Sequence, residues 1–231
     1  MLNLFGKTLA FFVLFLYNRG VFSLNVRLFT ADLSREAQTM RELKQAILQD
    51  GIAIGNDIIK VDMFLNHRID TGLMFRMGEE LAKRFAGEKP DLILTVEASG
   101  IALALTTAHA MGDVPVLFAK KAATVVQSPD VAQASVYSFT HKRENIIRAD
   151  KKYLPQGSRV LIVDDFLSDG QACQGMMALC AQTGCQVIGI GIGIEKGFMP
   201  GGKNIRAMGV NIQSLAVVTG IEDGKILLAD D

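Results

Sequence analysis

The chain has 231 residues, and its 24 basic and 24 acidic side chains balance at pH 7. This balance excludes a general electrostatic attraction for nucleic acid or for an anionic membrane. The length suits one α/β domain with a sizeable core, alone or with an extension. Three cysteines without metal spacing indicate a reducing, cytoplasmic compartment, in which they serve as small buried apolar residues.

An apolar stretch at residues 9–17 comes first along the chain, and it is too short to cross a hydrocarbon layer about 30 Å thick. Lys7 before it gives a faint likeness to a signal peptide, but the residues that follow lack an Ala-x-Ala cleavage site. We therefore expect residues 1–39 to be an N-terminal extension outside the working protein, translated from an upstream start codon. Residues 40–231 are then the functional domain. A peripheral membrane anchor is the alternative for the extension.

From residue 34 onward the apolar residues follow helical or strand periods. A first helix is expected over residues 34–50, and Asp70 is the expected N-cap of a second helix that ends at Phe85. Strands and helices then alternate, which predicts an α/β fold with a mainly parallel sheet flanked by helices. The expected strands are 92–96, 114–119, 160–163, 187–195, 212–218 and 225–228, the expected helices are 100–111, 171–182 and 204–208, and exposed or edge strands are expected at 135–139 and 145–148.

The most informative segment follows the buried strand at 160–163. Asp164 and Asp165 stand at the end of this strand, and a small-residue turn then enters a helix. The turn and the helix start consist of Ser168, Asp169, Gly170, Gln171 and Ala172. Backbone N–H groups point outward at such a turn, and the helix dipole favours an anion there. Because neighbouring carboxylates repel each other, a sugar diol or a divalent cation is expected against them.

Phosphate, diol and metal in one place predict a site for a phosphorylated ribose. The alternative is an acidic pair in a solvated loop, because strand–glycine–helix turns are common in α/β proteins. The segment is neither a Walker A loop nor a dinucleotide-binding motif. A second strand end, Glu97-Ala98-Ser99-Gly100, also enters a helix and forms either another anion-binding corner or only a capped helix start. Ligands bind such folds outside the carboxyl ends of the strands, where both motifs fall.

Four separated segments resemble the bacterial xanthine phosphoribosyltransferases, a subgroup of the type I phosphoribosyltransferase family. In chain order they are 59–67, 134–140, 164–172 and 191–198. Many family members have Thr-Gly-x-Thr in the phosphate loop, whereas this chain has Asp169-Gly170-Gln171-Ala172, which is similar to the xanthine subgroup. The likeness runs from about Met40 to the C-terminus.

The resemblance implies a fold with a small hood and a flexible lid loop, the lid being the long polar segment 120–133. The implied reaction converts xanthine and 5-phosphoribosyl 1-diphosphate to xanthosine 5′-monophosphate and diphosphate. Mg²⁺ is the implied cofactor, and the implied state is a homodimer that binds neither nucleic acid nor a membrane.

The same resemblance implies roles for single residues at the donor. Asp164 and Asp165 would hold the ribose hydroxyls and metal-bound water, and residues 168–172 would hold the 5′-phosphate. Ser99 and Gly100 would hold the diphosphate. Lys120, with Lys121 at the root of the lid, would meet the diphosphate too, unless the two form only a solvated charge pair.

At the base, xanthine presents carbonyl oxygens, which an amide donor and a cation suit. The resemblance implies Asn66 as the amide donor and Lys196 as the cation, with Ile59 against the ring face. Phe166 is a weaker candidate for stacking, since a core position is the commoner outcome for such a residue. Ser168 stands where related purine enzymes have an Asp as proton acceptor, so the general base stays open. The three histidines have no metal or triad spacing.

Two rival functions use the same motifs. A purine-responsive regulator would sense the donor, but residues 1–39 are too short and too uncharged for the winged-helix domain that such regulators carry. A guanine or hypoxanthine phosphoribosyltransferase shares the fold, and xanthine and guanine stay open as the preferred base. Lys196 and Asn66 argue against adenine in particular.

Overall fold

The computed structural model describes residues 41–121, 130–138 and 143–230. The chain divides into two compact units, Met1–Gln38 and Thr39–Asp231, and the description that follows concerns the second. The expected extension 1–39, the start of the first expected helix and most of the expected lid lie outside the described residues. Within these residues no helix is long and apolar enough to cross a membrane.

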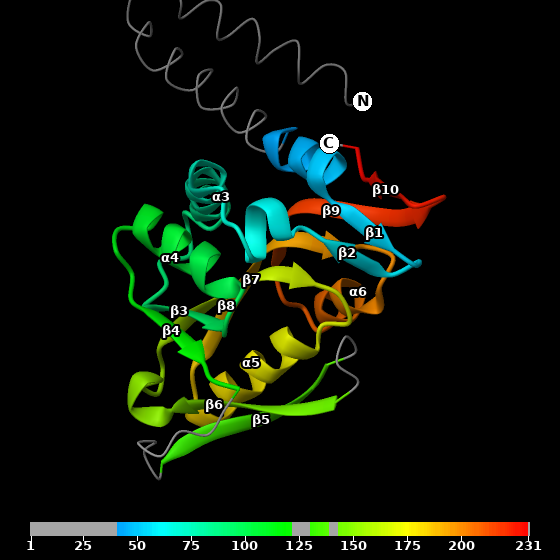
Figure 1. Cartoon of the computed structure of the whole chain (residues 1–231). Helices are drawn as coiled ribbons and strands as arrows, with labels where there is room; N and C mark the ends of the chain where they lie inside the picture. Colours follow the sequence, from blue (N-terminus) through cyan, green and yellow to red (C-terminus); the bar gives the residue numbers. More distant parts are fainter. Residues whose placement is uncertain (1–40, 122–129, 139–142, 231) are drawn as a thin grey trace, which may run out of the picture. The chain divides into compact units, whose positions relative to one another are not determined.

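A six-stranded sheet forms the centre of the domain, in the order β10-β9-β8-β7-β3-β4 (Figure 1). Five strands are parallel and β10 pairs antiparallel with β9 at one edge, so the predicted mainly parallel sheet is confirmed. The strands are β3 (Leu92–Val96), β4 (Val116–Ala119), β7 (Arg159–Leu167), β8 (Gln186–Lys196), β9 (Ile212–Glu222) and β10 (Lys225–Leu228).

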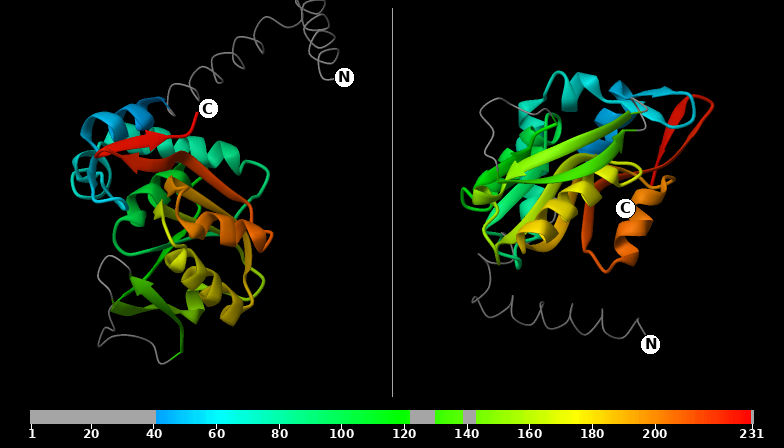
Figure 2. Two further views of the ribbon diagram at one scale, coloured as in Figure 1. Left: turned by 90° about the vertical axis from the view of Figure 1, so that its right-hand side faces the viewer. Right: turned by 90° about the horizontal axis from the view of Figure 1, so that it is seen from below.

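Helices cover both faces of the sheet, because its strands carry apolar side chains on both sides. In β7, Leu161 and Val163 pack in the cluster with α3 (Thr71–Arg84) and α4 (Gly100–Ala110). Val160 and Ile162 alternate with them and pack on the other side, against α5 (Gln171–Thr183). Figure 2 shows the same layers from two further directions.

A separate hairpin lies outside α5. It consists of β5 (Val131–Ser138) and β6 (Arg143–Asp150), which form a sheet of their own. Ala132 and Ile147 bury their side chains in the α5 cluster. The strands predicted in this region are therefore present but longer than expected, and the segment expected as a lid ends earlier, since β5 begins at Val131.

Local signals place several element boundaries. The Asp70 side chain accepts a hydrogen bond from Leu73 N at 2.9 Å, which confirms the predicted N-cap of α3. The helix over 41–50 ends before Gly51, as predicted. Strand β4 starts two residues later than expected, because the Val114 N–H still bonds to the end of α4. Helix α6 (Pro200–Ala207) starts four residues earlier than expected, with proline in its first turn, where the missing N–H costs nothing.

The hood predicted from the resemblance is a small hairpin, β1 (Ile52–Ile54) with β2 (Ile58–Lys60), followed by a π-helix at Asp62–Asn66. Figure 1 shows it beside the β10–β9 edge of the sheet. Val61, Phe64 and Leu65 bury this segment in the α3 and α4 cluster.

Candidate active site

The candidate site lies where the strand order of the sheet reverses, between β3 and β7. From β3 the chain continues through α4 to β4 on one side, and from β7 it continues through α5 to β8 on the other. Helices α4 and α5 lie on opposite faces, so their connections diverge at the carboxyl ends of β3 and β7, the place where ligands bind in sheets of this kind. Loops from several distant parts of the chain therefore meet at this point.

The acidic pair lies within the last four residues of β7, because this strand runs to Leu167 and not, as predicted, to Val163. Asp164 and Asp165 are only 4% and 6% exposed. Ser99 Oγ donates to Asp165 Oδ1 at 2.8 Å, and Asn66 Nδ2 lies 3.5 Å from Asp165 Oδ2. Asp165 thus contacts one side chain of the hood and one of the loop after β3. The structure brings together three segments that the sequence analysis singled out separately.

Burial raises the pKa of Asp164 well above its ordinary value of 3.8, and the charge of Asp165 raises it further. The Asp165 N–H donates to Asp164 Oδ1 at 3.1 Å, and this hydrogen bond lowers the pKa of Asp164. A carboxylate in this position is costly unless hydroxyl donors or a cation approach it. The environment therefore suits a ligand that supplies one or both.

Gly100 allows the loop after β3 to approach the acidic pair. A Cβ on this residue would lie 2.5 Å from Asp164 Oδ1 and 2.3 Å from Thr95 Oγ1. Thr95 is fully buried, and its hydroxyl has no hydrogen-bond partner among the described residues. Any larger residue at position 100 would therefore displace either the acid or the strand.

The turn after β7 leads directly into the start of α5, so the predicted order of strand, turn and helix is present. Gly170 takes a left-handed conformation, with φ of +83°, directly before the first residue of α5. Asp169 Oδ1 accepts from Gln171 N at 3.0 Å and so holds the turn from within. Register places Leu167 beside Glu195, so this turn lies next to the end of β8.

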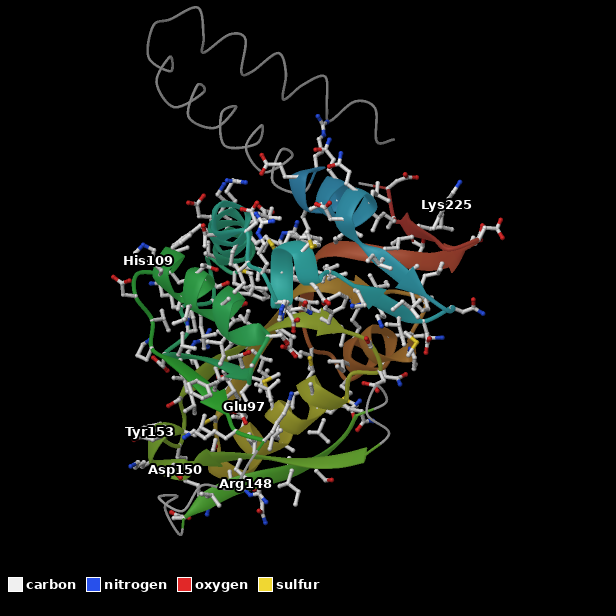
Figure 3. The ribbon with its side chains drawn as sticks, viewed as in Figure 1. Glu97, His109, Arg148, Asp150, Tyr153 and Lys225 are labelled. Atoms are coloured by element: carbon white, nitrogen blue, oxygen red, sulfur yellow. The ribbon has the colours of Figure 1, made fainter. Side chains whose placement is uncertain are left out.

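Lys120 and Glu97 meet at a third strand end. Parallel pairing puts Val96 beside Ala119, and the Glu97 N–H donates to Ala119 O. Lys120 exchanges both backbone hydrogen bonds with Arg148 of β6, so the hairpin abuts this corner (Figure 3). Lys120 is exposed, and its backbone follows Ala119, which accepts from Glu97 at the start of the loop that contains Ser99 and Gly100. The expected diphosphate residues are therefore neighbours.

On the other side of the acidic pair, Lys196 ends β8 and reaches the hood. Its Nζ donates to Asp57 O, in the tip of the β1–β2 hairpin, at 2.6 Å, and lies 6.0 Å from the centre of the Phe166 ring. Burial lowers the pKa of Lys196, while the charges of Asp57 and Asp169 partly oppose this shift. Lys196 thus lies between the tip of the hood and the Phe166 ring.

Ile59 lies apart from the polar residues of the site. Its side chain is 7% exposed and belongs to the core cluster with α3 and α4. Phe166, the weaker stacking candidate, is partly buried against the same cluster. Ile59 therefore has a core position, whereas Phe166 lies beside a polar residue of the site, Lys196.

Sequence reasoning missed Glu195 and Arg206. Glu195 is 4% exposed and accepts two hydrogen bonds from Arg206, at 2.6 and 2.7 Å. Burial by itself would raise the pKa of Glu195, but the bonds from Arg206 and Ser214 outweigh it and lower the pKa. The sequence signal that could have found Arg206 is Pro200. This proline marks the start of α6 and so places Arg206 in the last turn of the helix.

His109 lies outside the site, and Cys173 and Cys180 belong to the core cluster around α5. His109 Nδ1 lies 2.8 Å from Asp113 at the outer end of α4 (Figure 3). Cys173 and Cys180 are buried, as predicted, and burial raises the pKa of Cys180 to about 12. Within residues 41–121, 130–138 and 143–230, no three His, Cys, Asp or Glu side chains are grouped so that they could hold a metal.

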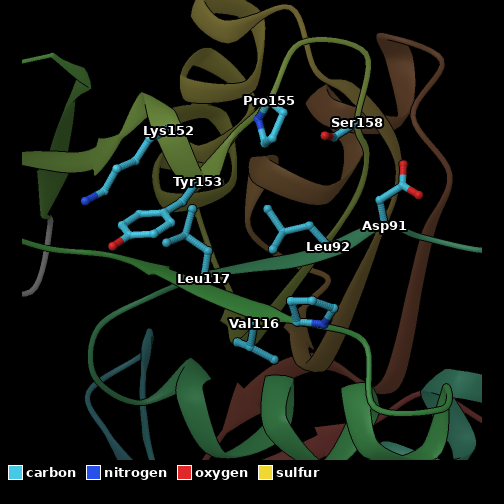
Figure 4. Close-up of a pocket in the computed structure, with 9 residues that line it drawn as sticks. Asp91, Leu92, Val116, Leu117, Lys152, Tyr153, Pro155 and Ser158 are labelled. Atoms are coloured by element: carbon cyan, nitrogen blue, oxygen red, sulfur yellow. The ribbon is translucent and has the colours of Figure 1, made fainter.

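A hollow of about 510 Å³ lies at the opposite end of the strands (Figure 4). Asp91, Val116 and Ser158, at or next to the first residues of β3, β4 and β7, line it together with Lys152 and Tyr153. This is the amino edge of the sheet, so the hollow is separate from the acidic pair.

Comparison with known proteins agrees with this arrangement. Residues 66–207 match the family described as the phosphoribosyl transferase domain. The xanthine phosphoribosyltransferase of Clostridioides difficile is 46% identical over 187 residues, which are 81% of this chain and 98% of that protein. The chain belongs to the phosphoribosyltransferase family.

Further relatives of this phosphoribosyltransferase support the same assignment. The xanthine phosphoribosyltransferase of Heliobacterium modesticaldum is 49% identical over 190 residues, 82% of this chain and all of that protein. The adenine phosphoribosyltransferase of Rhodothermus marinus has the same fold, with a TM-score of 0.63 at 21% identity over 79% of this chain and 99% of that one. The family and fold predicted from the sequence are confirmed.

Proposed function

We propose that this phosphoribosyltransferase transfers the 5-phosphoribosyl group from 5-phosphoribosyl 1-diphosphate to xanthine and releases xanthosine 5′-monophosphate and diphosphate, as a step of purine salvage. The observation that carries the proposal is the contact of Ser99 and Asn66 with Asp165, because it joins three loops around one buried acid. The names of relatives that are 46% and 49% identical support xanthine as the base.

The donor would lie across the carboxyl ends of β3, β4 and β7. Its 5′-phosphate would take the N–H groups of residues 168–172, where the start of α5 adds a favourable dipole. Its ribose hydroxyls would donate to Asp164 and Asp165, which removes the cost of two buried carboxylates. Ser99, Gly100 and Lys120 would hold the diphosphate.

The base would lie between the hood and the end of β8. Lys196 Nζ would donate to a carbonyl oxygen of xanthine, either in place of Asp57 O or in addition to it. Asn66 would supply an amide donor. Ile59 and Phe166 would support the ring from the apolar side. Two cationic or amide donors suit a base rich in carbonyl groups.

The residues present fit a magnesium ion that the donor brings with it. Asp164 and Asp165 offer hard oxygen donors, and Mg²⁺ keeps several waters and needs only one or two carboxylates beside the phosphates. When bound, the ion neutralises the charge of the departing diphosphate. The protein itself positions the two reactants and stabilises charge at the sugar carbon, without a covalent bond to the enzyme.

We also propose that the enzyme is a cytoplasmic homodimer. Phe75, Leu105 and Phe118, on α3, α4 and β4, are 50%, 54% and 38% exposed and form a candidate interface. The three thiols, without a disulfide, fit a reducing compartment. Light scattering should give twice the chain mass, and a mass of one chain would contradict the dimer.

Turnover with radiolabelled bases tests the proposed function. Xanthine, guanine, hypoxanthine and adenine are each offered with the donor, with and without Mg²⁺. We expect product from xanthine at the highest kcat/KM, none above background from adenine, and a loss of product without the metal. A higher kcat/KM for guanine than for xanthine would contradict the proposed base.

A further inference from the structure

The end of β8 and helix α6 are joined by an ion pair in which the acid, Glu195, is buried and the Arg206 side chain is 43% exposed. Glu195 accepts from both terminal nitrogens of Arg206, at 2.6 and 2.7 Å, and from Ser214 Oγ of β9 at 2.5 Å. A bidentate guanidinium–carboxylate pair fixes direction as well as distance. The pair therefore ties α6 to two neighbouring strands of the sheet.

Helix α6 also touches the phosphate turn, defined as residues 168–170. Gly201 N donates to Ser168 O at 3.1 Å. A Cβ on Gly201 would lie 2.4 Å from both Gly170 N and Ser168 O, and a Cβ on Gly170 would lie 3.1 Å from Ile205 Cδ1. The backbone of the helix therefore lies directly on the backbone of the turn, so any shift of α6 moves the turn as well.

The same first turn of α6 also lies on the buried acid. A Cβ on Gly202 would be 2.0 Å from Glu195 Oε1. Two consecutive glycines thus contact the phosphate turn on one side and the ion pair on the other. Register adds a second connection, because Glu195 lies beside Leu167, the residue before the phosphate turn.

We propose that Glu195 and Arg206 are positioning residues for the donor: their ion pair holds α6 against the phosphate turn and so presets the N–H groups that receive the 5′-phosphate. The inference rests on the proposed function, because it takes this phosphate as the ligand of the turn. Both side chains act through the turn and not through contact with the donor. Groups that are already in place bind more tightly than groups that must first be ordered.

Substitution Arg206→Gln tests the inference in the full chain. We expect KM and Kd for 5-phosphoribosyl 1-diphosphate to rise about tenfold, because small displacements of binding groups have large effects. The KM for xanthine should change less than about twofold, since Lys196 and Asn66 hold the base. A role in folding alone would not separate the two substrates in this way.

A matched control is Arg84→Gln, which breaks a similar ion pair on the other face of the sheet. Arg84 Nε lies 2.9 Å from Glu80 Oε1, and Glu80 is 6% exposed. Both pairs also involve Ser214, through its carbonyl oxygen for Arg84 and its hydroxyl for Glu195. The control should lower the Tm by a similar amount and leave the donor constants unchanged.

Since Arg206→Gln leaves a buried charge behind, a double variant separates stability from positioning. Glu195→Met with Arg206→Met removes the charge and keeps the volume, so the Tm should recover while the donor KM stays raised. Ser214→Ala keeps the pair and removes one bond, so it should fold normally and raise the donor KM only slightly.

Three results would overturn the inference: a donor KM that recovers with the Tm in the double variant, an equal rise in Arg84→Gln, or unchanged donor constants in Arg206→Gln. If the wild-type enzyme turns over normally, such a result concerns the ion pair alone. A wild-type chain without turnover on xanthine and the donor would instead contradict the proposed function, and this inference with it.

Discussion

Asp164 is held in an environment that opposes its own charge. It is 4% exposed and adjoins a second carboxyl, and burial is the main reason that its pKa is raised. A carboxyl whose pKa is raised by folding costs stability once the pH exceeds its unfolded pKa, and the cost grows until the folded pKa is reached. At neutral pH the acid therefore opposes folding, which is typical of a group retained for binding.

Asp164→Asn should stabilise the free protein and remove its activity. The amide keeps the acceptor for Asp165 N without the charge, so the Tm should rise by about 2–4 °C for each kcal/mol of relieved cost. Turnover should fall at least about a hundredfold, because a group that holds the ribose hydroxyls is lost. Thermal melts and steady-state rates measure both. A lower Tm with normal turnover would refute this role.

Lys196→Ala should raise the KM for xanthine at least about tenfold, the scale of one hydrogen bond to a charged group, and affect the donor KM much less. Because burial lowers the pKa of Lys196, the wild-type KM for xanthine should rise as the pH increases through this lowered value, below the ordinary 10.5. Lys196→Arg stays charged and should lack this alkaline rise. Equal effects on both substrates would contradict the assignment.

Single residues also mark where sequence reasoning stops. The acidic pair could be predicted as part of a site from the sequence, because two adjacent carboxylates after a buried strand repel each other and need a ligand. The bond from Lys196 to Asp57 could not be predicted, since it joins residues 139 positions apart through the folding of the hood. Glu195 was missed for the same reason: its partners Arg206 and Ser214 lie on two other elements.

Among the elements, β3, α4 and β7 meet at Gly100. Gly100→Ala would bring a methyl group within 2.5 Å of Asp164 Oδ1, so we expect turnover to fall about a hundredfold, as for a misplacement near 1 Å. Gly87→Ala is the control, because a Cβ there meets nothing within 4 Å and its φ is not positive. Assays of both variants at saturating substrate measure the effect. Similar rates in Gly100→Ala and Gly87→Ala would show that the close contact between position 100 and Asp164 is unimportant for turnover.

Elements with a strong local signal were predicted closely, and the others were not. Asp70 caps α3 and Gln171 starts α5, as expected from an N-cap and a glycine turn. Helix α6 has two glycines in its first turn, so its apolar period starts late and its beginning was placed too far along the chain. The β5–β6 hairpin was predicted only as two short strands. Its strands pair with each other, and this pairing gives no clear sequence pattern that marks their full length.

At the scale of the whole molecule, every candidate site residue lies within the phosphoribosyltransferase domain, residues 40–231. We propose that residues 40–231 suffice for activity and that residues 1–39 are an extension. A chain that starts at Met40 should match the full chain in kcat/KM within about twofold, because every candidate site residue lies in the compact unit from Thr39 onward. A large loss of activity would contradict this, as would native peptides from residues 20–35 in mass spectrometry.

The central claim is that one turn and one acidic pair bind a ribose 5-phosphate donor. Calorimetry with 5-phosphoribosyl 1-diphosphate and Mg²⁺ tests it most directly, on the wild-type chain and on Asp164→Asn with Asp165→Asn. We predict saturable binding of one donor per chain in the wild type and none in the double variant under the same conditions. Absence of heat in the wild type, or equal affinity in the two proteins, would contradict the account.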